Sequence, residues 1–86
     1  NAELRAMEAA VAELNARESL IWTNIKLSHV GWTTDDNLFA IVDTTLGQGF
    51  TWDGAPNASG GILQYRSQSK NLTRDASTSI LAAKWY

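Results

Sequence analysis

Few side chains in this sequence are suited to catalysis. The chain has one histidine, His29, and no cysteine, and it contains no glycine-rich phosphate loop, paired-histidine metal motif or nucleophile elbow. His29 lies beside Val30 and close to Trp32 in an alternating apolar stretch, which is typical of a structural or interface histidine rather than a general base. The sequence therefore predicts a protein that is not an enzyme and that uses no cofactor.

The charged residues also give little support to a metal or a nucleic acid as ligand. Asp35, Asp36 and Asn37 offer the oxygen ligands that calcium prefers, but their spacing is not that of a calcium loop. Pairing of acids with bases across strands or subunits is the favoured interpretation, and no metal site is predicted. Nine acidic residues against seven basic ones argue against nucleic acid, because phosphate-binding surfaces are basic. No apolar run approaches the ~20 residues that span a bilayer, so no membrane insertion is expected.

Four tryptophans in 86 residues are the best indication of a binding surface. Trp52 lies in a turn-rich stretch next to Asp53, and an indole beside a carboxylate suits stacking on a sugar ring. We take Trp32, Trp52 and Asp53 as candidate ligand-binding residues. A role in the core or in a subunit interface is nevertheless the favoured one for each of the four tryptophans, including Trp22 and Trp85.

The composition of the chain changes near Ser19. Every glutamate and six alanines precede this residue, whereas every aspartate and glycine follows it. Alanine and glutamate favour helices, while aspartate, threonine and glycine favour turns and strands. The sequence predicts a helix over residues 2–19, and this boundary divides the chain into a stalk (1–19) and a β-rich head (20–86).

Large apolar residues recur along the helix with a period of seven. The pattern places Leu4, Val11, Glu18 and Ile25 at a positions and Met7, Leu14 and Ile21 at d positions, which predicts a coiled coil. Glu18 then marks either the end of the coil or a polar layer that fixes its register. A trimer is preferred, although these residue types do not decide the number of helices. The alternative is an amphipathic helix that packs on its own sheet. The predicted oligomer interface contains Leu4, Met7, Val11, Leu14, Ile21, Trp22 and Ile25.

The second half of the chain has the composition of short strands separated by turns. Alternation and turn residues predict strands over 27–33, 38–45, 50–53, 61–68 and 79–86, although residues 75–83 also fit one helical face. The predicted fold class is α+β, with an N-terminal coiled-coil helix and a small, mainly antiparallel β head. A domain this small without disulfides is marginal alone. An intertwined homotrimer would supply a shared core.

The heptad seam and the strand-turn series from Leu38 to Tyr86 resemble the C-terminal ends of trimeric bacteriophage tail fibres and related virion spikes. This resemblance implies a non-enzymatic homotrimer on the virion, outside the cell, that attaches to a glycan or protein on the host surface. It transfers no binding residues. The first alternative is a structural trimerisation cap without a ligand. The second is a monomeric α+β binding module.

Overall fold

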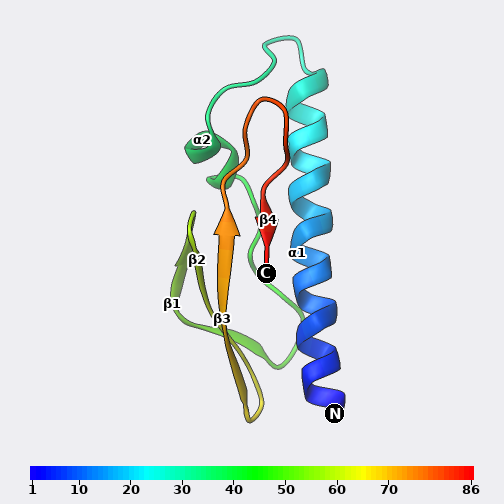
Figure 1. Cartoon of the computed structure of the whole chain (residues 1–86), viewed down its shortest axis with the longest axis vertical. Coiled ribbons are helices and arrows are strands. Elements are labelled where there is room, and N and C mark those ends of the chain that lie inside the picture. Colours follow the sequence, from blue (N-terminus) through cyan, green and yellow to red (C-terminus); the bar gives the residue numbers. More distant parts are fainter.

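The computed structural model describes all 86 residues and shows one long helix beside an antiparallel sheet (Figure 1). The helices are α1 (Ala2–Leu27) and α2 (Asp35–Phe39). The strands are β1 (Phe50–Asn57), β2 (Gly60–Tyr65), β3 (Gln68–Asp75) and β4 (Lys84–Trp85). They form a four-stranded sheet in the order β1-β2-β3-β4, with every neighbouring pair antiparallel. The predicted α+β class, with the helix first and an antiparallel sheet after it, is confirmed.

Helix α1 is longer than the composition change predicts. It begins after Asn1, whose side chain accepts a hydrogen bond from the Leu4 amide, and it continues to Leu27. Ser28 ends it, because both its amide and its hydroxyl donate to the Ile25 carbonyl. The division expected at residues 19 and 20 therefore falls inside one continuous helix.

Two of the predicted strands do not form. The segment 27–33 is the end of α1 and a loop, and the segment 38–45 begins in α2. Thr34 starts α2 by accepting a hydrogen bond from the Asn37 amide, and Asp35 and Asp36 occupy the first turn, where carboxylates are favoured by the helix dipole. These capping residues outweigh the apolar alternation that suggested a strand.

The four strands form a meander. The sequence predicts its first two strands better than its last two. β1 contains the predicted segment 50–53. Of the predicted strand 61–68, only residues 61–65 belong to β2, because residues 66 and 67 form the turn into β3. The rest of β3 lies in a segment for which the sequence predicts no strand, and the expected strand over 79–86 is reduced to Lys84–Trp85. Gly60, at the start of β2, has φ +134°, and a Cβ there would collide with the Leu72 carbonyl oxygen. Only glycine fits this position of the β1–β2 hairpin.

The core lies between α1 and one face of the sheet. It consists of six buried residues: Met7, Ala10 and Leu14 from α1, and Leu63, Leu72 and Trp85 from the strands. The helix therefore packs on the sheet of its own chain, as in the second interpretation of the heptad. β4 lies between β3 and α1 (Figure 1), and its Trp85 belongs to this core.

Candidate functional site

The most elaborate side-chain arrangement in the protein is a buried ionic cluster at the middle of α1. Glu18, from α1, and Arg74, from β3, both have side chains that are completely buried. Arg74 Nε donates to Glu18 Oε2 over 2.7 Å, and Arg74 Nη1 donates to Asp35 Oδ2 over 2.8 Å. The indole N–H of Trp85 also donates to Glu18 Oε2, over 2.8 Å. The cluster thus connects α1, α2, β3 and β4 at one point.

Every donor of the Arg74 guanidinium has an acceptor. Its five N–H groups bond to both oxygens of Glu18, both oxygens of Asp35 and the Ala58 carbonyl. The Phe39 ring covers the guanidinium at 4.8 Å. Arginine is suited to this position because its planar fork pairs with two carboxylates at once.

The charges in the cluster stabilise one another. Burial by itself raises the pKa of Asp35, but hydrogen bonds from Arg74 and Ser77 and the charge of Arg74 outweigh it, and the pKa falls below its ordinary value. Burial likewise opposes the charge of Arg74, yet its bonds to Asp35 and Glu18 raise the pKa of the guanidinium. Both groups therefore stay charged at neutral pH, and their bonds hold the surrounding elements together.

The three candidate ligand-binding residues do not come together. Trp52 lies on the inner side of β1, where its ring is 5.7 Å from that of Trp85 and its indole N–H donates to the Thr44 carbonyl. Asp53 is exposed, and successive strand residues point to opposite faces, so its carboxylate does not accompany the indole. Trp32 is half-buried in the loop 28–34, between α1 and α2.

The predicted oligomer interface lies mainly on the sheet side of α1. Met7 and Leu14 are buried within the chain, and Val11 packs against the same core. Ile21, Trp22 and Ile25 are half-buried, and the Trp22 indole N–H donates to the Thr78 carbonyl in the loop 76–83. Leu4, at the first turn, stays 46% exposed. Most of this seam thus already has a partner in its own chain.

Several large apolar side chains remain outside the core. Four of them are on α1 or in the loop that follows it, one follows α2, and three are near the C-terminus. The exposed set is Leu4, Leu20, Leu27, Val30, Ile41, Ile80, Leu81 and Tyr86.

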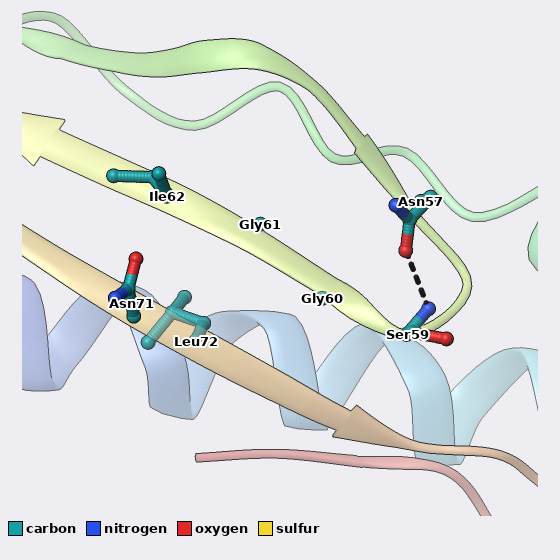
Figure 2. A pocket seen from close by; sticks show the side chains of 7 residues that line it. All are labelled: Asn57, Ser59, Gly60, Gly61, Ile62, Asn71 and Leu72. Atoms are coloured by element: carbon teal, nitrogen blue, oxygen red, sulfur yellow. Dashed lines mark hydrogen bonds between the residues drawn. The ribbon is translucent and has the colours of Figure 1, made fainter.

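The hollows in the surface are open to solvent, and none of them encloses a small ligand. One, of about 260 Å³, lies near the β1–β2 turn, where Asn57 Oδ1 accepts a hydrogen bond from the Ser59 amide (Figure 2). Gly60 and Gly61 form its floor without side chains, and no charged residue lines it. Another, of about 370 Å³, lies between α1 and the end of the chain, with Glu8, Lys70 and Lys84 at its rim.

Comparison of the chain with protein-family models, with curated proteins and with solved structures gives no match.

No helix of the structure is both long and apolar enough to cross a membrane. No group of three or more histidine, cysteine, aspartate or glutamate side chains is placed to hold a metal ion. Asp35 and Asp36, weighed as calcium ligands, differ in surroundings: Asp35 pairs with Arg74, and Asp36 is exposed.

The sequence contains a signal for one member of the ionic cluster. Glu18 interrupts an apolar seam, and a charged residue in a seam requires a buried partner or an end of packing. Nothing in the spacing identifies Arg74 or Asp35 as that partner, because they lie 56 and 17 residues away.

Proposed function

We propose that this protein is a non-enzymatic subunit of an extracellular fibre, of the virion type that the sequence resembles, and that it associates with copies of itself. The observation that carries the proposal is the set of large apolar side chains that stay exposed, outside the core of the single chain. Association with another chain would remove such apolar surface from water.

Two features of the site support an assembling role over a catalytic one. The charged side chains that are buried are fully paired with each other, and His29 is exposed in a loop. The chain is also elongated, 44 Å in its longest extent against 21 and 19 Å in the others, and α1 lies along the side of the sheet (Figure 1). A homotrimer is the state that the resemblance implies.

Analytical ultracentrifugation of the full chain tests self-association. We expect the weight-average mass to rise above the 9.4 kDa of one chain as the concentration increases from about 10 µM to about 1 mM, the range in which small interfaces associate. A trimer would approach three times that mass. A constant mass of one chain over the whole range would contradict the proposal.

Host attachment is a second candidate function, favoured by the loop 28–34. This loop extends beyond the C-terminal end of α1 (Figure 1), exposes His29 and Val30, and holds the half-buried Trp32. Binding of the chain to host cells or to a glycan array tests it. Trp32→Ala should reduce binding, whereas Asp53→Asn, on the exposed side of β1, is the control expected to bind normally. Absence of binding by the unaltered chain would exclude this role for the chain.

A further inference from the structure

The C-terminal part of the chain lies along one flank of α1 and is bonded to it from near the end of the helix to its middle. Lys26 and Trp22 donate hydrogen bonds to carbonyls of the loop 76–83. Asn15 bonds both backbone groups of Trp85: its amide nitrogen donates to the carbonyl over 2.9 Å, and its side-chain oxygen accepts from the amide over 2.7 Å. The Asn15 side chain thereby takes the place of a neighbouring strand beside β4.

The same flank of α1 is uncovered nearer the N-terminus. Val11 lies four residues before Asn15 and hence on the same side of the helix, and Glu8 and Leu4 continue this side at intervals of three and four. Leu4 is 46% exposed, and Val11 is half-buried. Glu8 and Val11 line the hollow of about 370 Å³, which has Trp85 at one end. The hollow therefore begins where β4 ends, part of the way along β3 (Figure 1).

Strand β3 has a free edge beside this hollow. The backbone N–H and C=O groups of Thr73 both bond to Tyr86, so they point toward β4. Alternate residues of a strand direct these groups to the same edge, which places those of Asn71 and Ser69 on this side too. The ladder between β3 and β4 does not extend beyond Thr73. The N–H and C=O groups of Asn71 and Ser69 therefore have no partner in the chain.

The hollow and the free edge together continue the space that β4 occupies. We name this space the strand groove. It lies between residues 69–72 of β3 and the α1 residues Glu8, Val11 and Ala12. An extended peptide presents N–H and C=O groups to one edge at every second residue, which is the spacing of the free groups on β3. The groove is thus complementary to a strand, as in proteins that bind peptides by adding them to the edge of a sheet.

We propose that the strand groove binds an extended peptide segment of another protein, which adds to β3 antiparallel and end to end with β4. This inference goes beyond the fibre function and does not depend on it. Side chains of the segment that lie opposite Leu72 and Lys70 face α1, because cross-strand neighbours share a face. We expect the first to be apolar, since it would cover Val11. We expect the second to be acidic, because Lys70 forms no ion pair in the chain although Glu8 lines the same groove.

A capped peptide with this pattern tests the groove directly. Acetyl-Val-Thr-Glu-Thr-amide would place its valine opposite Leu72 and its glutamate opposite Lys70. We expect it to slow the solvent exchange of the Ser69 and Asn71 amide hydrogens several-fold in NMR measurements, because both gain an acceptor. The amide hydrogens of Lys70 and Leu72, on the β2 side of β3, should keep their rates. Unchanged exchange of Ser69 and Asn71 at about 10 mM peptide, enough to detect millimolar binding, would overturn the proposal.

Two altered peptides separate the contributions of backbone and charge. Methylation of both threonine nitrogens removes the donors that would bond to Asn71 and Ser69, and this peptide should not slow the exchange. Replacement of the glutamate by lysine places like charges opposite each other at Lys70, and this peptide should bind more weakly. Equal effects of the methylated and unmethylated peptides would show that no strand is added to β3.

Attachment of the same four residues after Tyr86 tests the groove without dissociation of the peptide. The extended chain should show the same slow exchange at Ser69 and Asn71. Proline as the second added residue removes the donor to Asn71 and should abolish the effect, whereas proline as the first added residue, whose nitrogen points away from β3, should preserve most of it. The opposite order, or no slowing in any extended chain, would contradict the proposed register.

A pair of substitutions on α1 tests the location. Ala12 and Ala9 are both exposed, but only Ala12 lines the groove. Ala12→Trp should block the peptide and Ala9→Trp should not, with circular dichroism to establish that both variants are folded. Equal peptide binding by the two variants would contradict the location. If Ala12→Trp alone also abolishes self-association in the ultracentrifuge, a second copy occupies the groove, and the assignment to another protein is wrong.

Discussion

The two faces of α1 have the same seven-residue period and different surroundings. The inner face buries Met7 and Leu14 against the sheet, whereas the outer face leaves Leu20 and Leu27 in solvent. The inner face also contains Glu18, whose charge is matched by Arg74 from the sheet. A heptad pattern thus identifies a face that packs, but it does not identify the partner. In this protein the more apolar seam belongs to folding, and the alanine-rich one stays in solvent.

Removal of the buried charge of Glu18, on the inner face of α1, should cause the largest loss of stability. Glu18→Ala would leave two Arg74 donors and the Trp85 indole without their acceptor, and loss of one partner of a buried pair costs about 3–5 kcal/mol. Glu13→Ala, five residues earlier, breaks only the partly exposed pair with Arg17, which is worth ~0–1 kcal/mol. Urea unfolding followed by circular dichroism measures both. Similar losses in the two variants would show that the cluster does not stabilise the fold.

Truncation of one leucine on each face compares packing directly. Leu14 is completely buried, and Leu14→Ala should lower the free energy of unfolding by about 2–5 kcal/mol. Leu20→Ala should change it by less than ~0.5 kcal/mol, because the side chain is exposed and leucine and alanine have similar helix propensities. Thermal unfolding at low protein concentration keeps self-association out of the measurement. A large loss for Leu20→Ala would mean that the outer face packs within the chain.

Acid should weaken the inner face through Asp35. Its pKa is lowered in the folded protein, so its contribution to stability is present above the ordinary aspartate pKa of ~3.9 and is lost as pH falls below that value. The free energy of unfolding should decrease between about pH 4 and pH 2, and Asp35→Asn should reduce that decrease. Asp43, whose pKa is lowered chiefly by the Thr45 amide, is the control. Because Asp43 is exposed, Asp43→Asn should flatten the acid profile less than Asp35→Asn.

The sequence predicts the helix, its period and the antiparallel class of the sheet, because these depend on local composition and spacing. The prediction from sequence fails at positions where contacts with residues distant in the chain determine the secondary structure. The Ile21 and Trp22 region continues α1 because the loop 76–83 binds it, with the Trp22 indole on the Thr78 carbonyl. Residues 68–75 are polar along most of their length, and they become β3 through pairing with β2 on one side and β4 on the other.

The roles of the candidate functional residues also depend on contacts that the sequence does not show. Tryptophan content suggests a binding surface, yet Trp85 is buried and bonded to Glu18, and the Trp52 ring lies tilted beside it. Side-chain type alone does not distinguish a large aromatic that fills a small core from one that contacts a ligand. The solvent-facing side of α1 is not identified by large apolar residues, because alanines such as Ala2, Ala9 and Ala16 are exposed on it. Its identification depends on knowing which face of α1 the sheet covers.

The smallest predicted change in stability distinguishes the two candidate ligand-binding tryptophans, Trp32 and Trp52. The Trp52 indole N–H donates to the Thr44 carbonyl over 2.9 Å in a partly buried position, so Trp52→Phe should lower the free energy of unfolding by about 0.5–1.5 kcal/mol. The structure gives the Trp32 indole no such hydrogen bond, and Trp32→Phe should change stability by less than ~0.5 kcal/mol. Chemical unfolding of both variants measures the difference. Equal losses would place Trp32 among the residues that hold the fold, which would remove the reason to regard its loop as a free contact surface.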